Sequence, residues 1–451
     1  MANPKNPYLR GLLAPVTEEV TAYDLPVTGR IPSGLRGRYL RIGPNPLGPI
    51  TPEEDASYHW FTGHGMVHGI RLRDGRAEWY RNRWVRSREV AERLGEPWPA
   101  GPIVEDYDVS PNTHVIEHAG ETLALIEGGS TPYRLDHELR TLGPTDFGGT
   151  LKRGYTAHPK KDPETGELHA IGYFPGGEHL EYTVLNASGL VVRSVEIPVA
   201  GSPMVHDFAL TQKYVVIYDL PVTFSMRMAK EGARLPYAWN PEHPARVGVM
   251  SRDGGAAGVR WIDIPPSWVF HTLNAYDDGD RIVVDLVRFP SFMHDGRLDG
   301  NPPPTLDRWT IDLSAGKVLQ ETVDDRGQEF PQVDERLATR PHRYGYTVTA
   351  EAVVQHQAGE ALMKHDYAGG SSEVRLFQAG SGVSEAVFVP SAPGAAEDDG
   401  YLMALAFDPE RGATDLVIVS SQDFTGEAVA TVRLPVRVPL GFHGSWAPDT
   451  D

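Results

Sequence analysis

The most constraining feature of this sequence is a strand–turn–strand unit that recurs with a histidine in or just before its first strand. The clearest copy runs from Trp268 through an Asp277-Asp278-Gly279-Asp280 turn to Arg288. An acidic, glycine-containing turn between two β-branched and aromatic runs is typical of a hairpin. The second run is apolar at both odd and even positions, which is typical of a strand covered on both faces. We therefore expect His271 to lie on an inner strand.

The same unit occurs at three other places in the chain. His206 precedes the apolar run at 214–218, His158 precedes the run at 168–173, and His114 precedes the run at 122–127. Repeated hairpins with similarly placed histidines indicate radial repetition around an axis, as in a β-propeller. Such a ring needs a terminal strand to close it, and we assign that role to the segment 435–443.

Composition limits the chemistry that the chain can perform. The 451 residues include no cysteine, which excludes disulfides, thiolate nucleophiles, iron–sulfur clusters and cysteine-bound zinc. Any metal must therefore be bound by histidine or carboxylate. The net charge of -19 argues against nucleic-acid partners and against electrostatic docking to anionic lipid. Forty-seven glycines and 38 prolines indicate many turns without the composition of a disordered chain.

The pattern predicts one all-β domain over residues 1–451, because no stretch has the composition of a flexible interdomain linker. Residues 1–36 form an N-terminal arm in this interpretation. The segment 86–94 has helical composition, and the Met- and aromatic-rich segment 224–245 is a cap insertion over one face. The first 45 residues contain no apolar run long enough for a signal peptide or a membrane span, so we expect a cytoplasmic location.

Four histidines are candidate metal ligands, namely His158, His206, His271 and His443. Spacing alone is a weak signal, because none of them belongs to a His-x-x-x-His pattern, and a histidine beside aromatic residues is more often a structural residue. Their placement on inner strands strengthens the hypothesis, because a closed propeller brings the ends of those strands together on its axis. The four side chains are therefore able to converge.

Six ordered motifs resemble the carotenoid cleavage oxygenases, a family of propeller dioxygenases similar to the retinal pigment epithelial membrane protein. These motifs cover nearly the whole chain: residues 41–46, 156–159, 204–207, 270–275, 397–400 and 442–444. The sequence departs from the family pattern at Ile42, where relatives often have Asn, and at His64, where many have Asp. Both departures affect the edge of the fold more than the metal.

The resemblance implies a seven-bladed β-propeller, with a loop and short-helix cap, that holds one non-haem Fe(II). By residue-for-residue match the ligands are His158, His206, His271 and His443, while His68 and His114 are structural, the latter close to the axis. Three further glutamates of the family, which hydrogen-bond to the ligands, match Glu127, Glu329 and Glu385. Without the resemblance, each of these glutamates would be interpreted as a solvated surface charge.

The resemblance, together with this ligand set, implies an Fe(II)-dependent dioxygenase that uses O₂ to cleave a carbon–carbon double bond of a carotenoid or apocarotenoid into two carbonyl products. An apolar conjugated substrate also implies transient membrane contact during uptake. The alternative within the family is a stilbenoid or vinylphenol oxygenase, but Ile126 stands where such relatives have a Lys beside the glutamate. A metal-free propeller scaffold and a propeller hydrolase are the alternatives from other classes.

Overall fold

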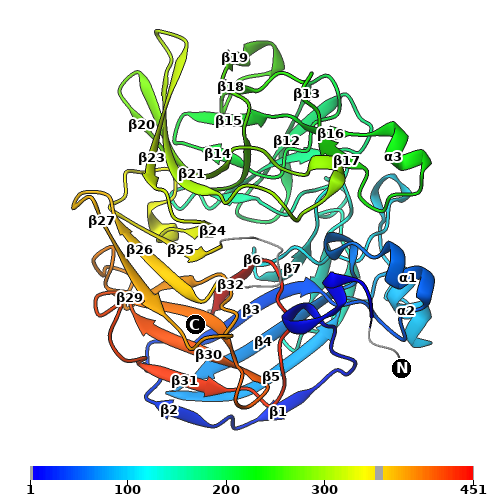
Figure 1. Ribbon diagram of the computed structural model, residues 1–451, viewed down its shortest axis with the longest axis vertical. Helices are drawn as coiled ribbons and strands as arrows, with labels where there is room; N and C mark the ends of the chain where they lie inside the picture. The colour runs from blue at the N-terminus through cyan, green and yellow to red at the C-terminus, as the bar shows by residue number, and fades with distance from the viewer. Residues whose placement is uncertain (1–3, 351–358, 450–451) are drawn as a thin grey trace.

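Seven four- or five-stranded antiparallel sheets are arranged around a central axis in the computed structural model, which describes residues 4–350 and 359–449. The inner strands β6, β24 and β32 lie around the centre of the ring in Figure 1. We number the sheets as blades 1 to 7. The predicted seven-bladed β-propeller is confirmed.

Blades 2 to 6 follow the chain from their inner to their outer strand. Blade 2 contains β6 (His114–His118), β7 (Glu121–Leu125), β8 (Tyr133–Leu135) and β9 (Thr141–Pro144). Blade 3 contains β10 (Lys160–Lys161), β11 (Leu168–Tyr173), β12 (His179–Leu185) and β13 (Val191–Pro198). Blade 4 contains β14 (Phe208–Leu210), β15 (Tyr214–Asp219), β18 (Arg246–Ser251) and β19 (Arg260–Asp263). Blade 5 contains β20 (Trp268–Asp278), β21 (Arg281–Phe289), β22 (Thr305–Asp312) and β23 (Lys317–Asp324). Blade 6 contains β24 (Gln328–Gln332), β25 (Tyr344–Thr349), β26 (Ala361–Asp366) and β27 (Ser371–Leu376).

Blades 1 and 7 combine strands from both ends of the described chain. From outer to inner edge, blade 1 contains β1 (Thr21–Tyr23), β5 (Arg76–Trp84), β4 (Gly65–Arg73), β3 (Gly37–Pro44) and β32 (Gly444–Pro448). In the same order, blade 7 contains β2 (Val27–Gly29), β31 (Ala430–Arg433), β30 (Ala413–Ser420), β29 (Gly400–Asp408) and β28 (Val387–Pro390). The ring is therefore sealed twice, by β32 at the axis and by β1 and β2 at the rim.

The position of the closing strand corrects the sequence-based prediction. The segment 435–443 is irregular, and the strand that pairs with β3 begins at Gly444, opposite Arg41. Pro435 and Pro439 lack the backbone N–H that a ladder requires, which explains why pairing starts only after them. His443 consequently lies just before the inner strand, at the level of the axis.

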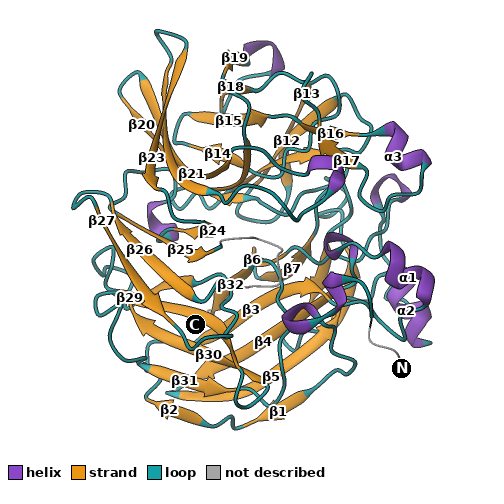
Figure 2. Ribbon diagram, in the orientation of Figure 1, coloured by secondary structure: helices purple, strands orange, loops and turns teal. Residues whose placement is uncertain are grey.

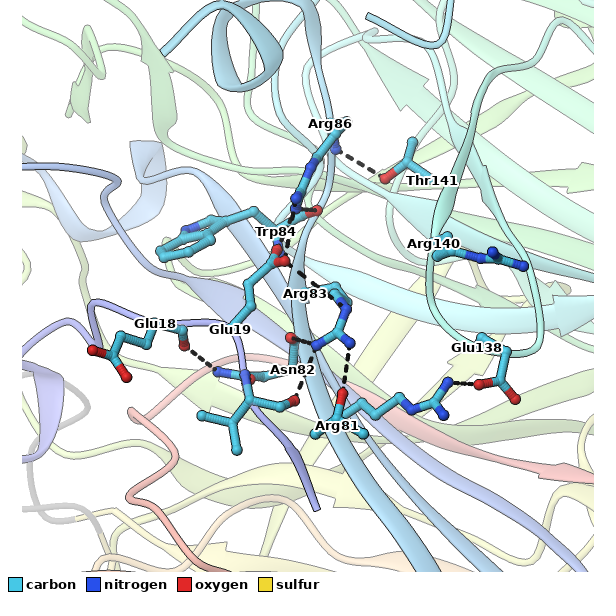
Figure 3. A network of polar contacts seen from close by, with 12 residues as sticks. Glu18, Glu19, Arg81, Asn82, Arg83, Trp84, Arg86, Glu138, Arg140 and Thr141 are labelled. Carbon is cyan, nitrogen blue, oxygen red and sulfur yellow. Dashed lines mark hydrogen bonds and ion pairs between the residues drawn. The ribbon is translucent and has the colours of Figure 1, made fainter. Parts of the chain in front are cut away.

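The N-terminal arm is fixed to the rim by a polar network on β5 (Figure 3). Asn82 donates from Nδ2 to the carbonyl of Glu18 at 3.0 Å, and Arg83 donates to the carbonyl of Val20 at 3.0 Å. The Glu19 carboxylate accepts from the backbone N–H of Trp84 at 2.8 Å and pairs with the Arg86 guanidinium. These contacts keep β1 in register with β5, which is the outer half of the ring closure.

Each twisted sheet is covered on both faces, because apolar side chains fill the spaces between neighbouring blades. The largest cluster joins blades 3, 4 and 5 and contains Tyr182, Phe208, Trp268 and Trp309, all at most 1% exposed. Burial on both faces explains the continuous apolar runs that the sequence shows at β15 and β21.

The labelled α-helices lie along one edge of the ring (Figure 2). They are α1 (Pro52–Ser57), α2 (Arg88–Leu94) and α3 (Met226–Lys230). The last belongs to the predicted cap segment, where it stands between the paired strands β16 (Val222–Phe224) and β17 (Tyr237–Trp239). Among the described helices, none combines the length and the apolar character needed to cross a membrane.

Candidate metal centre

The four candidate histidines come from four different blades and lie at the start of the inner strands. His158 is two residues before β10, His206 is two residues before β14, and His443 immediately precedes β32. His271 lies within β20, where the pairing with β21 shifts register on both sides of Thr272. Such a bulge redirects a side chain, and here it allows His271 to reach the axis although the strand begins three residues earlier.

The four imidazoles converge on one point. One ring nitrogen of each lies within 4.8 Å of those of the other three, and the Nε2 atoms of His206 and His271 are 3.1 Å apart. All four residues are buried, with 6–9% of their surface exposed. The structure thus brings together residues separated by as many as 285 positions.

Three buried or half-buried glutamates contact the far side of three of these rings. Nδ1 of His206 lies 2.8 Å from Glu127, Nδ1 of His271 lies 2.6 Å from Glu329, and Nδ1 of His443 lies 2.9 Å from Glu385. A carboxylate at Nδ1 holds the proton there, so Nε2 presents a bare lone pair toward the axis.

Blades 6 and 7 supply two of these carboxylates from their inner strands. Glu329 lies in β24, and Glu385 lies two residues before β28, so both occupy positions at the start of the inner strand, like the histidines of blades 1, 3 and 4. Glu127 differs, because it follows β7, the second strand of blade 2. The shared position explains five of the seven residues, and Glu127 and the bulged His271 depend on local geometry.

Electrostatics favour the neutral form of three of the rings. Burial is the largest cause of lowering the pKa of His271 to about 3, and burial together with the neighbouring imidazoles holds the pKa of His158 and His443 well below the usual value. Neutral imidazole is the form that binds a metal.

The donor set fits a metal ion. Nε2 of His158 is buried without a hydrogen-bond partner in the described structure, and the facing nitrogens of His206 and His271 are both lone-pair donors. Buried polar atoms are nearly always satisfied, and a cation between the rings would supply the partner that these nitrogens lack. Four imidazole nitrogens suit iron, zinc, copper or nickel.

An apolar pocket of about 400 Å³ leads to the centre. Three of the histidines, His206, His271 and His443, form part of its wall. Its other lining residues are mainly aromatic or aliphatic and include Trp60, Phe61, Ile126, Phe270, Phe330 and Phe442. A second cavity, lined by Arg36, Arg38, Arg71 and Glu117, is polar and does not include the histidines. An apolar molecule therefore has a mainly apolar route to three of the four rings.

Comparison with known proteins places the chain in a family. Residues 13–448 match the family model described as "Retinal pigment epithelial membrane protein". The chain belongs to this family. It is 48% identical to the "Carotenoid cleavage oxygenase" of Mycobacterium tuberculosis over 503 residues, covering 100% of this chain and 99% of that protein. It is 33% identical to the "Isoeugenol monooxygenase" of Pseudomonas nitroreducens over 481 residues, covering 99% of each.

Solved structures agree with this assignment. The crystal structure of the Pseudomonas brassicacearum lignostilbene dioxygenase superposes with a TM-score of 0.89 at 29% identity, and all of each chain is covered. The resemblance to carotenoid cleavage oxygenases that the six motifs indicated is confirmed.

Some residues around the centre of this family member were not found from the sequence. Tyr173 donates from its hydroxyl to Glu127 at 2.9 Å, and the ring of Phe330 stacks on His271 with centroids 5.5 Å apart. Phe330 also has a left-handed backbone, with φ of 53°, which places its own N–H against Glu329. No spacing in the sequence predicts these contacts, because they depend on how neighbouring blades face one another.

The other histidines singled out in the sequence lie outside the group of four. His114 is bonded through Nδ1 to the carbonyl of Ala157 at 2.9 Å, with its ring 5.3 Å from that of His443. His68 is bonded through Nδ1 to the hydroxyl of Tyr80 at 3.0 Å. His64 accepts from the N–H of Leu47 at 3.1 Å, at the edge of blade 1. Ile42 is fully buried in β3.

Proposed function

We propose that this protein is an Fe(II)-dependent dioxygenase that cleaves a carbon–carbon double bond of a carotenoid or apocarotenoid, with O₂, into two carbonyl products. His158, His206, His271 and His443 would hold the iron. The observation that carries the proposal is the apolar pocket whose wall includes three of the four converging imidazoles. Iron(II) in such a site supplies the O₂ activation that a closed-shell alkene requires.

The protein's own residues would contribute position and environment. Glu127, Glu329 and Glu385 keep the proton of each ring at Nδ1, fix the tautomer and increase the donor strength of Nε2. The aromatic wall excludes water and presents flat surfaces to a conjugated chain. No general base is needed, because the proposed cleavage removes no proton from the substrate.

The pocket favours a polyene over a phenol. Ile126 lines it directly before Glu127 and cannot stabilise a phenolate. Burying a hydroxyl without a partner costs roughly 1–3 kcal/mol. We therefore expect at least tenfold higher kcat/KM for an apocarotenoid than for a 4-hydroxystilbene, which corresponds to about 1.4 kcal/mol.

A phenylpropanoid alkene is the second candidate. Two observations favour it: the likeness to a lignostilbene dioxygenase structure and to an isoeugenol monooxygenase, and the presence of Tyr107 in the pocket wall. Tyr107 is 44% exposed and offers a hydroxyl to a polar end group.

Product analysis after aerobic incubation separates the two candidates. The iron-loaded protein is given carotenoids, apocarotenals and 4-hydroxystilbenes side by side, with the variants Ile126→Lys and Ile126→Met. We expect the lysine variant to gain activity toward the phenol, whereas methionine, of similar length and without charge, should not. Faster cleavage of the stilbene by the wild-type protein would move it to the phenylpropanoid branch. If the protein as purified contains no iron, and the iron-loaded protein takes up no oxygen, a scaffold or a hydrolase would be favoured.

We also propose transient membrane contact during substrate uptake. Met226, 58% exposed, begins α3, and the residues that follow this helix, Arg234 and Leu235 among them, line the pocket. Co-sedimentation with phosphatidylcholine vesicles should decrease on Met226→Glu, and an unchanged bound fraction would contradict this proposal.

A further inference from the structure

The bulge that aims His271 at the axis leaves the backbone N–H of Thr272 to be satisfied by a residue of another blade. Across β20 and β21, Val269 faces Arg288, Thr272 faces Leu286 and Asn274 faces Asp285. The inner strand therefore carries an extra residue on each side of Thr272. A bulged strand loses regular ladder bonds at the extra residues.

The carboxylate of Asp207 satisfies this group. Its Oδ2 accepts from the backbone N–H of Thr272 at 2.8 Å, and its Oδ1 accepts from the backbone N–H of Phe208 at 2.8 Å. Asp207 is only 2% exposed, so these bonds form away from bulk water. Blade 4 thereby holds the bulge of blade 5.

A third contact extends the link to blade 3. The ammonium group of Lys160 donates to the same Oδ2 at 2.8 Å, and its side chain is 26% exposed. This ion pair balances a carboxylate that would otherwise be buried as an isolated charge.

Each of the three linked groups is close in sequence to a candidate ligand. Asp207 follows His206, Thr272 follows His271, and Lys160 is two residues after His158. One carboxylate therefore ties together the backbone of two ligand-bearing segments and a side chain from a third. Sequence-distant segments need such a link, because among the described strands no backbone ladder joins the inner strands of different blades.

We propose that Asp207 is a positioning residue for the metal site, which sets the mutual distance of His158, His206 and His271 by holding the β20 bulge and Lys160. This inference rests on the proposed metal site, but not on the proposed substrate. It concerns the geometry of the four imidazoles and requires no contact of Asp207 with the metal.

Cobalt(II) binding to the metal-free full chain tests the proposal without any turnover. Affinity is measured by competition with a chromophoric chelator, and the visible d–d bands report the geometry of the site. We expect Asp207→Ala to weaken binding about 10–100-fold and to shift the bands, as is usual when a residue that orients ligands is lost. Asp207→Asn can keep an oxygen for the Thr272 N–H and Lys160, but it turns an amide N–H₂ toward the Phe208 N–H and removes the negative charge that pairs with Lys160. It should therefore keep the wild-type bands and lose about three- to tenfold in affinity, less than Asp207→Ala.

Asp307→Asn is the matched control. Asp307 is also buried, and its carboxylate accepts from the Arg288 guanidinium and from the Thr305 hydroxyl, but it lies on β22, which does not pair with β20. We expect this variant to lose thermal stability while its cobalt affinity and bands stay unchanged.

Wild-type affinity and bands in Asp207→Ala would overturn the proposal, as would an equal loss of affinity in Asp307→Asn. If Asp207→Ala does not fold, Asp207→Asn and Lys160→Met decide: weaker binding in both supports the proposal, and unchanged binding in Asp207→Asn overturns it. The proposed function fails separately, if wild-type protein binds the metal normally but cleaves no alkene.

Discussion

Replacing Glu385 by glutamine removes the charge and one acceptor oxygen while keeping the shape of the side chain, and the structure predicts which contact is lost. Oε1 of Glu385 accepts from Nδ1 of His443 at 2.9 Å and from Nε2 of Gln332 at 2.8 Å, while Oε2 accepts from the backbone N–H of Gly444 at 2.9 Å. Glutamine has one acceptor oxygen, so whichever way it is turned, an N–H₂ group faces at least one donor.

Loss of one charge-assisted hydrogen bond at a buried site costs roughly 1.5–3 kcal/mol, which predicts about 10–100-fold weaker metal binding for Glu385→Gln. At Glu127 both donors, His206 Nδ1 and the Tyr173 hydroxyl, reach the same oxygen, Oε2. A glutamine can satisfy both there, so Glu127→Gln should weaken binding by less than about tenfold. The two variants should therefore differ in metal affinity, because the donors reach both oxygens of Glu385 but only one oxygen of Glu127.

Chelator competition on metal-free protein measures both affinities, and circular dichroism checks that each variant is folded. The expected order of weakening is His443→Ala, then Glu385→Gln, then Glu127→Gln. An effect below twofold for Glu385→Gln, or a larger effect at Glu127 than at Glu385, would refute the reasoning that these carboxylates act by orienting the rings.

Three further predictions concern the metal, the oxygen and the pH. His206→Ala and His271→Ala should each abolish cleavage and most of the bound iron, as measured by elemental analysis; full activity in either variant would contradict the ligand assignment. After short incubations with aldehyde trapping, ¹⁸O₂ should label both carbonyl fragments, whereas label in only one fragment would indicate a monooxygenase. Burial lowers the pKa of His68 to about 3, so the unfolded chain takes up the proton first and stability falls as pH drops below about 6.5. Between pH 6.5 and 5 this amounts to about 2 kcal/mol, and denaturation of metal-free His68→Gln should show a correspondingly smaller loss than wild type.

The sequence by itself determined the ring. A hairpin repeat with apolar runs at β15 and β21 requires sheets that are covered on both faces, and the histidines near the first strand of each unit indicate the axis. Periodicity and turn chemistry are local properties, so they are readable from neighbouring residues. Glu127, Glu329 and Glu385 were identified only through the family resemblance, because a lone glutamate in a strand has no local signal that distinguishes it from a surface charge.

Only the tertiary structure decided how the inner ends of the blades meet. The closing strand begins at Gly444 and not at Pro435, because the prolines before it cannot pair. The bond from Thr272 to Asp207 joins residues 65 positions apart, and the stacking of Phe330 on His271 joins residues from adjacent blades. These contacts depend on the angle and distance between blades, which are set by packing of the whole ring and leave no periodic trace in the sequence.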